Sequence, residues 1–336
     1  MLNKIRQKGI LQIVLLFLSE GKRLNLIKYN KKLQKRMELS FDDYKKYNQI
    51  VIEIIPIEKL DEKEEKNKFI NRIEDNSLYH IYFNELNEEI HRYHIKKDEK
   101  IKKITIVIDM EVTSLKELFW ECESIKEIKI IKCNRKNIVD MSYMFSWCTN
   151  LVKLDISKLR TDNTIDMNNM FRVCNKLEEL DLSNFKTDNV KNMRSMFYAC
   201  DSLVRINLSN FNTINVEIMN LMFYFCSKIK ELDLSNFNTE RVKDMDLMFY
   251  GCESLEKLNI TSFRINESCT MESMFQKCKS LNELDISNFH FSYPQNDIKS
   301  MFYECSPKLK KNIKNQKPDI DEKAFQNPYP HLLKHH

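Results

Sequence analysis

The sequence predicts an α/β repeat solenoid: a stack of about eight strand-turn-helix units with a parallel sheet on one face. A Met-Phe or Leu-Phe pair, with Cys three residues after the Phe, recurs eight times along the 336-residue chain. The Phe residues are 26 apart in six steps and 27 apart in the last. Such a period indicates units that bury their apolar faces against each other. The pairs are Phe119/Cys122, Phe145/Cys148, Phe171/Cys174, Phe197/Cys200, Phe223/Cys226, Phe249/Cys252, Phe275/Cys278 and Phe302/Cys305.

The composition supplies a large core and excludes one class of nucleotide site. Hydrophobic residues make up 42% of the chain, with 20 Phe and 16 Met, while 31% of residues are charged. Glycine occurs only at Gly9, Gly21 and Gly251. A phosphate-cradling loop needs several neighbouring residues without a Cβ. The sequence therefore excludes glycine-rich nucleotide-binding loops and predicts no cofactor.

Charge divides unevenly along the chain. Residues 1–38 carry a formal charge of +8, residues 39–305 carry −7, and residues 306–336 carry +4. A nucleic-acid-binding domain usually presents a basic patch or stripe over its body. Because the body here is acidic, we predict no nucleic-acid partner.

Residues 1–39 have two possible interpretations. The apolar run 10–18 is too short to span a bilayer, which takes about 20 residues, so no transmembrane span is predicted. It resembles the apolar region of a secretory signal peptide with a basic start. It also fits the first helix of a helical hairpin, since apolar positions continue through Leu24, Leu33 and Met37. The hairpin favours a cytoplasmic protein, and the signal peptide favours secretion.

Residues 40–109 are predicted to form an α+β connecting region and an N-terminal cap. Strands are expected at 50–57, 79–83, 90–95 and 101–108, and a charged helix or linker at 58–75. An open sheet edge invites pairing with other chains. We therefore expect these strands to cover the first repeat unit.

Each unit of the repeat region 110–305 follows one pattern. In the unit from Leu177 to Leu203, Leu180, Leu182 and Phe185 alternate with polar residues, as in a strand with one buried face. A turn follows, and Asn189 is placed as the N-cap of a helix. The helix is predicted from apolar residues at spacings of 3, 4 and 7, namely Val190, Met193, Met196, Phe197, Cys200 and Leu203.

The terminal units depart from this pattern, as expected of caps that face water on one side. The first unit has Leu118-Phe119 in place of Met-Phe, and the penultimate unit has Ile265 and Ser268 where others have Thr and Val. Residues 306–336 contain four of the six prolines. We expect this segment to be a flexible tail.

The string LDLSNFKTDNVKNMRSMFYACDSL, Leu180 to Leu203, and its relatives elsewhere in the chain resemble the BspA-type leucine-rich repeats of bacterial surface proteins and anaerobic protists. The resemblance covers roughly residues 100–305. It implies a leucine-rich-repeat-like solenoid that binds proteins or surfaces, with no catalytic residues. The N-terminal segment ILQIVLLFLSEGKRLNLIKYNKKLQKRMEL loosely resembles an F-box-like hook, but it lacks the usual Leu-Pro start and the late Trp.

The histidines and cysteines predict no metal site and no enzyme. Eight of the ten cysteines occupy one buried repeat position, where Cys packs as a small apolar residue; disulfides between neighbouring units are the alternative. No cysteine pair has the spacing of a zinc site. His91 and His94 would face opposite sides of a strand. The repeats hold only His290, so a catalytic base is missing.

The exposed strand face is the candidate binding surface, because stacking turns its polar residues into columns. One column alternates in charge, which lets neighbouring strands attract each other; its members are Lys153, Glu179, Arg205, Glu231, Lys257 and Glu283. The next is acidic with two interruptions: Asp155, Asp181, Asn207, Asp233, Asn259 and Asp285. A third contains Ser157, Ser183, Ser209, Ser235, Thr261 and Ser287.

The function predicted from these observations is that of a non-catalytic, protein-binding solenoid, an interaction or adaptor protein that uses the strand face. Two alternatives stay open. The face is a solvated surface that compensates its own charges, or the chain is a secreted or surface-displayed adhesion protein of the BspA type.

Overall fold

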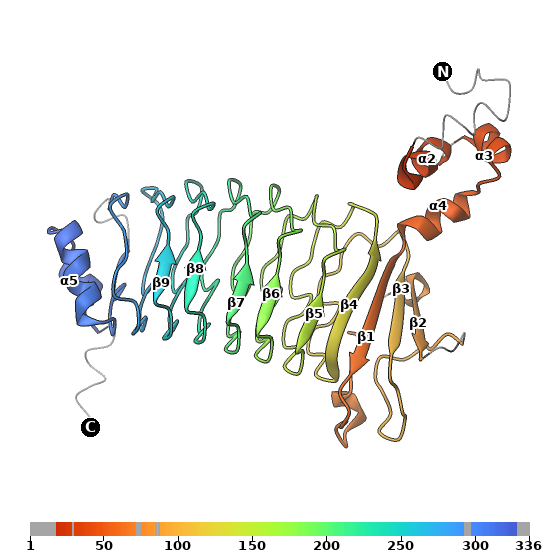
Figure 1. Cartoon of the computed structure of the whole chain (residues 1–336), viewed down its shortest axis with the longest axis horizontal. Coiled ribbons are helices and arrows are strands. Elements are labelled where there is room, and N and C mark those ends of the chain that lie inside the picture. The colour runs from red at the N-terminus through yellow and green to blue at the C-terminus, as the bar shows by residue number, and fades with distance from the viewer. Residues whose placement is uncertain are drawn as a thin grey trace.

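The computed structural model describes residues 18–28, 30–71, 75–84, 86, 88–291 and 297–327. Stacked coils of chain form the body, with helices at both ends (Figure 1). The repeat fold expected from the 26-residue period is therefore present. No helix in the described part of the chain is long and apolar enough to cross a membrane.

Three short helices precede the body: α2 (Glu20–Ile27), α3 (Lys31–Met37) and α4 (Phe41–Asn48). The continuous second helix expected up to Met37 is thus divided. Asn30 caps α3, because its side chain accepts a hydrogen bond from the Leu33 backbone N–H. Among the residues whose burial is described, Leu24, Leu33 and Tyr44 are buried between these helices. Helices α2 and α3 stand away from the coils (Figure 1). Most of the apolar run 10–18 lies outside the described residues.

The cap is part of a five-stranded sheet of order β2-β3-β1-β4-β5. Alternate residues of β1 (Ile50, Ile52 and Ile54) are fully buried. β4 joins the cap to the repeats, since it pairs antiparallel with β1 and parallel with β5. The strands are β1 (Ile50–Pro56), β2 (Tyr79–Phe83), β3 (Ile104–Ile108), β4 (Ile125–Cys133) and β5 (Lys153–Asp155), with short 3-10 turns η2 (Glu64–Lys66) and η3 (Asn76–Leu78).

One cap strand was predicted wrongly. Residues 90–95 form no strand, and His94 makes only an isolated bridge to Lys68. Ile90 N–H also donates to the Ile81 carbonyl at 2.8 Å, so this segment covers the outer edge of β2 without extending the sheet.

The strand wall of the repeats is less regular than predicted. Its strands are three residues long and pair in parallel two by two, β6 with β7 and β8 with β9. The expected continuous parallel sheet is therefore interrupted between β5 and β6 and between β7 and β8. The strands are β6 (Glu179–Asp181), β7 (Arg205–Asn207), β8 (Glu231–Asp233) and β9 (Lys257–Asn259).

The predicted helix of each unit is absent, and hydrogen-bonded turns form the opposite wall. Between Met193 and Ala199, alternate N–H groups donate to the next coil: Met193 to Ile218, Ser195 to Asn220, Phe197 to Met222 and Ala199 to Tyr224, at 2.7–2.9 Å. Two of the N–H groups between them donate to carbonyls three residues earlier, Met196 to Met193 and Tyr198 to Ser195, and Arg194 N–H donates to Asn192 Oδ1. A continuous ladder of parallel bridges runs through this wall, Ser114–Asp140–Asp166–Asn192–Ile218–Asp244–Thr270.

Two residues per coil adopt a left-handed conformation to close these turns. Ser195 and Ala199 both have φ of 52°, and the same two positions are left-handed in neighbouring coils, for example Leu221 and Phe225. An L-residue in this region costs about 1–2 kcal/mol. Since Ser195 and Ala199 each donate a hydrogen bond to the next coil, the stack offsets this cost.

The core between the two walls contains stacked aromatic rings. Phe119 to Phe302 form one column of eight rings with centroids 5.3–5.7 Å apart. All eight rings are fully buried. Offset stacking of this kind adds about 0.5–1.5 kcal/mol per pair beyond the burial of area. The recurring Phe is therefore a core residue, as predicted.

Polar repeat positions satisfy backbone groups between coils. Thr187 Oγ1 donates to the Asn212 carbonyl at 2.9 Å and accepts from the Asn212 N–H at 2.8 Å. Asn189 was predicted to cap a helix, but its amide donates to the Asp162 carbonyl of the preceding coil at 2.8 Å. These bonds keep buried backbone groups paired in a chain with little regular secondary structure.

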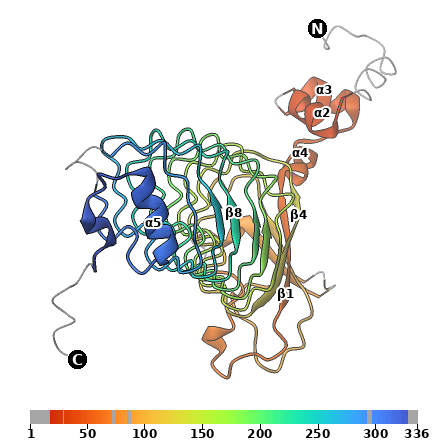
Figure 2. The same ribbon diagram turned by 60° about the vertical axis from the view of Figure 1, so that its left-hand side comes forward.

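A flexible tail was expected over residues 306–336, but its described part, 306–327, contains a helix and a 3-10 turn. Helix α5 (Pro307–Gln316) is capped by Ser306, and η4 (Glu322–Phe325) follows it. Both cover the last coil, as Figure 2 shows for α5. Phe325 stacks on Phe302 at 5.7 Å, and Phe302 N–H donates to the Ala324 carbonyl at 2.7 Å.

Candidate binding face

The residues of the predicted binding face lie along one wall of the stack. Each three-residue strand exposes its first residue, and the middle residue points toward the core, as in Glu179-Leu180-Asp181. Neighbouring strands pair in register, Glu179 opposite Arg205 and Asp181 opposite Asn207. The structure therefore brings the predicted columns together on this wall.

The charged column forms ion pairs two by two. Glu179 pairs with Arg205, and Glu231 pairs with Lys257. Lys153 lies 4.0 Å from Glu127 of β4. At the far end Glu283 pairs at 2.8 Å with Lys308 of α5, so the helix continues the column. These side chains are mostly exposed, and each pair therefore contributes at most about 1 kcal/mol.

The second and third columns are linked within each coil. The side-chain oxygen of Asp181 accepts the Ser183 N–H at 3.0 Å, and Asn207 accepts the Ser209 N–H at 3.2 Å. The same turn recurs at Asp155, Asp233, Asn259 and Asp285. Such Asx turns reverse the chain after a strand. The Asp of the Asp-x-Ser pattern therefore stabilises the turn and also exposes its carboxylate.

The four carboxylates of the second column fall into two pairs, one with a lysine nearby and one without an ion pair to a described residue. Hydrogen bonds from Ser157 lower the pKa of Asp155, which also lies 3.8 Å from Lys129. Hydrogen bonds from Ser287 likewise lower the pKa of Asp285, and Lys317 lowers it further. Asp181 and Asp233, by contrast, form no ion pair with any residue that the structure describes.

Shallow depressions lie over the paired strands. One is lined by residues of β6 and β7 together with Val204, Lys230 and Glu231. A second is lined by residues of β8 and β9 together with Glu256, Asn282 and Glu283. Val204 is 38% exposed, so the first depression offers an apolar patch among charged groups. Such a mixed, open surface suits a macromolecular partner better than an enclosed small molecule.

The cysteine column is a set of free, buried thiols. Cys226 Sγ donates to the Phe197 carbonyl at 3.1 Å, and the repeats after the first show the same bond, as at Cys200 to Phe171, whereas Cys122 Sγ donates to the Trp120 carbonyl of its own coil. Burial raises the pKa of Cys200 to about 12. The predicted packing role fits this geometry, and the disulfides held open as an alternative are absent from the ten cysteines.

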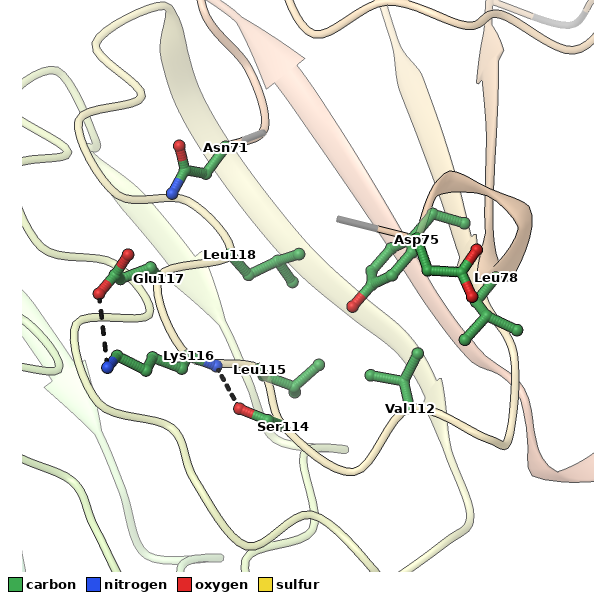
Figure 3. A pocket seen from close by; sticks show the side chains of 10 residues that line it. Asn71, Asp75, Leu78, Val112, Ser114, Leu115, Lys116, Glu117 and Leu118 are labelled. Atoms are coloured by element: carbon green, nitrogen blue, oxygen red, sulfur yellow. Dashed lines mark hydrogen bonds and ion pairs between the residues drawn. The ribbon is translucent and has the colours of Figure 1, made fainter. Parts of the chain in front are cut away.

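A pocket of about 510 Å³ lies between the cap and the first coil (Figure 3). Leu78, Val112, Leu115 and Leu118 supply its apolar side chains. Lys116 pairs with Glu117 at 3.8 Å, and its backbone N–H donates to Ser114 Oγ at 3.2 Å. These polar groups are thus engaged with one another.

The turn wall carries an aromatic stack that was not predicted from the sequence. Tyr198, Tyr224 and Tyr250 stack with centroids 4.6 and 4.9 Å apart. Arg172 lies 3.8 Å from the Tyr198 ring, and Lys277 lies 5.2 Å from the Tyr250 ring. Arg172 and Lys277 thus form cation–π contacts with the first and the last ring of the stack. The Tyr that directly follows the repeat Phe in three consecutive units is the signal that could have revealed it.

No three His, Cys, Asp or Glu side chains of the described ranges are placed to hold a metal ion together. The closest approach to such a cluster lies in the cap. His80 contacts Glu89 at 3.1 Å and Asp109 at 3.3 Å. Burial works against its protonation, but the bonds to Asp109 and Glu89 outweigh this and raise its pKa.

Comparison with known proteins adds two solved structures and one family. A leucine-rich repeat protein from Eubacterium ventriosum ATCC 27560 is 15% identical, with a TM-score of 0.37 over 57% of this chain and 55% of that one. One from Bacteroides ovatus ATCC 8483 is 19% identical, with a TM-score of 0.32 over 63% of this chain and 59% of that one. The matches thus span little more than half of each relative. No curated protein matches.

The family match covers the repeats and the C-terminal helix. It spans residues 113–231 and 201–316, which together make up more than half of the chain. The chain belongs to the family described as "Mycoplasma protein of unknown function, DUF285".

Proposed function

We propose that this chain is a non-catalytic binding protein whose strand face, centred on β6 to β9, contacts another protein. The observation that carries the proposal is the pair of carboxylates at Asp181 and Asp233. Both are exposed and form no ion pair with a residue that the structure describes, whereas Glu179 and Glu231 of the same strands pair with Arg205 and Lys257. Uncompensated charge on an otherwise self-paired surface favours a partner of opposite charge.

The apolar part of the face supports the same proposal. Val204 is exposed between Glu179 and Lys230 in one depression. Interfaces typically combine a small apolar centre with a polar rim. The face therefore combines both elements over β6 and β7.

A site-specific photo-crosslinker tests the proposal. Benzoylphenylalanine in place of Val204 should give a covalent adduct in the native cells, whereas the same residue in place of Ile214 should not. Ile214 lies in the next turn of the same coil and is 46% exposed, which makes it a matched control. Equal adducts from both positions, or none from Val204, would retire the strand face as the binding surface.

The predicted F-box-like hook and the BspA-type identity stay hypotheses of their own. Helices α2 and α3 lie within the segment to which the hook was assigned.

A further inference from the structure

We infer that the strand face takes the basic helices α2 and α3 of a second copy of this chain. The inference rests on the proposed function of the strand face and names its partner. Residues 18–40 contain seven Lys or Arg and two Glu, whereas residues 39–305 carry −7. Oppositely charged surfaces on one chain can pair between copies.

The cations of α3 are available for such pairing. Lys31 and Lys35 are exposed, and neither forms an ion pair with any described residue. Leu33 is buried against α2 and α4. At 100° per residue, Lys31 and Lys35 both lie about 160° from Leu33 around the helix. They therefore project from the face opposite the one that packs.

The spacing of the charges is compatible on the two surfaces. Lys31 and Lys35 are about 6 Å apart along the helix axis. Asp181 and Asp233 lie two coils apart, about 10 Å at the usual strand spacing. Since a lysine side chain extends several ångströms, both cations can reach both carboxylates. Lys22 of α2 adds a third exposed charge.

The helices do not reach the strand face within one molecule. They stand beyond the cap, at the end of the stack where β1 to β4 lie, whereas β6 to β9 lie further along it (Figure 1). Helix α4, which follows them, bonds to the body: Lys132 Nζ donates to the Lys46 carbonyl, and Asn134 Nδ2 donates to the Tyr47 carbonyl at 3.0 Å. The exposed cations are thus presented outward, toward another molecule.

Such docking joins two different surfaces, so it is heterologous and its assemblies are open-ended. The average mass should therefore rise with protein concentration. Because the contact is electrostatic and exposed, it should weaken at least tenfold between about 50 and about 500 mM NaCl, as screening shortens from over 10 Å to a few ångströms.

Sedimentation velocity of the full chain tests the inference through charge reversal. Two variants are needed: a face variant, Asp181→Lys with Asp233→Lys, and a helix variant, Lys31→Glu with Lys35→Glu. Each should sediment as a monomer at low salt. An equimolar mixture should associate again, because the reversed face meets the reversed helix and the two native surfaces meet each other.

The matched control reverses two carboxylates in the same coils but off the face, Asp188→Lys with Glu240→Lys, and should associate like the native chain. A native chain that stays monomeric at low salt, or a mixture that fails to associate, overturns the inference. The photo-crosslink separates the two proposals. An adduct of Val204 to a different protein supports the strand face as a binding surface but overturns the second copy as its partner.

Discussion

Single residues of the repeat divide into those that fill the core and those that pair backbone groups. Phe223 is fully buried in the ring column, whereas Thr213 bonds both the carbonyl and the N–H of Asn238. Core residues and hydrogen-bonding residues both recur every 26 residues, because each contacts a residue of the next coil, as Phe223 contacts Phe249 and Thr213 bonds Asn238. A leucine-rich string therefore encodes hydrogen bonding as well as packing.

Gly251 is the residue whose replacement should be most informative. Its φ is +74°, and a Cβ there would lie 2.9 Å from Phe225 Cδ1. Gly251→Ala should destabilise the chain by about 1–2 kcal/mol from backbone conformation, with a further loss from displacement of the Phe225 ring. Urea unfolding measures the change.

The double variant Gly251→Ala with Phe225→Ala should recover the steric part of that loss. A coupling of about 0.5–3 kcal/mol between the two sites is expected for groups in contact. Strictly additive effects would show that the ring and residue 251 do not interact.

The buried thiols predict a loss of stability at alkaline pH. Burial raises the pKa of Cys148, Cys200 and Cys252 to about 12, whereas the unfolded thiols titrate near their ordinary value of about 8.5. Above this value the unfolded state binds fewer protons than the folded state, so the free energy of unfolding falls as pH rises. The contribution of these thiols to the free energy of unfolding should be constant below pH about 8 and decline up to pH about 12.

Thermal melts from pH 7 to 11 check this dependence. Replacing Cys148, Cys200 and Cys252 with Ala should flatten the decline, although it also lowers stability at neutral pH. Thiol labelling offers an independent measurement, since the ten buried thiols should react only after unfolding. Rapid labelling of the folded chain would contradict the burial.

At the scale of elements, the sequence predicted the unit length, the buried positions and the first strands of the cap, but it misassigned the helix. Met193, Met196, Phe197 and Cys200 have the 3 and 4 spacing of a helix face, yet they form turns. A turn ladder with bonds over three residues buries the same positions as a helix. The difference lies in the alternate N–H groups, which donate to the next coil, and no local pattern encodes that partner.

Helix α5 shows a second limit of local reasoning. The prolines and lysines of residues 306–336 suggested a flexible tail, but side-chain amides of α5 cover the edge of the last coil. Leu284 N–H donates to Asn312 Oδ1 at 3.3 Å, and Ile286 N–H donates to Gln316 Oε1 at 2.9 Å. Gln316 Nε2 donates back to the Leu284 carbonyl at 2.7 Å. The helix thus replaces the missing next strand.

Loss of these amides should expose the edge. Asn312→Ala with Gln316→Ala should destabilise the chain by about 1 kcal/mol for each lost bond. Because an unpaired edge recruits other chains, the variant should also aggregate earlier on heating, as static light scattering would record. Lys310→Ala with Lys311→Ala, on the same helix, is the control that should behave like the native chain. Equal behaviour of the two variants would argue against edge protection.

For the whole molecule, the binding face was predictable as columns because register follows from the constant period. The pairing within those columns was not. The charge alternation suggested attraction on both sides of each residue, but Arg205 pairs with Glu179, not with Glu231. Which neighbour is chosen depends on the interruption of the strand wall between β7 and β8. The constant period of the repeats does not predict that interruption.

A stack of coils that touch only their neighbours should unfold by segments. Phe223 lies in the middle of the ring column, 5.3 Å from Phe197 and 5.6 Å from Phe249. Phe223→Ala should cost about 3–5 kcal/mol. Amide hydrogen exchange should show the greatest loss of protection in the coils that contain these three rings, and little change in β1 to β3. Phe302→Ala, next to the C-terminal cap, should confine its effect to the last coils. If both variants lowered protection evenly from β1 to α5, the chain would unfold as one cooperative unit. The continuous ladder of bridges along the turn wall would then be the structural link between distant coils.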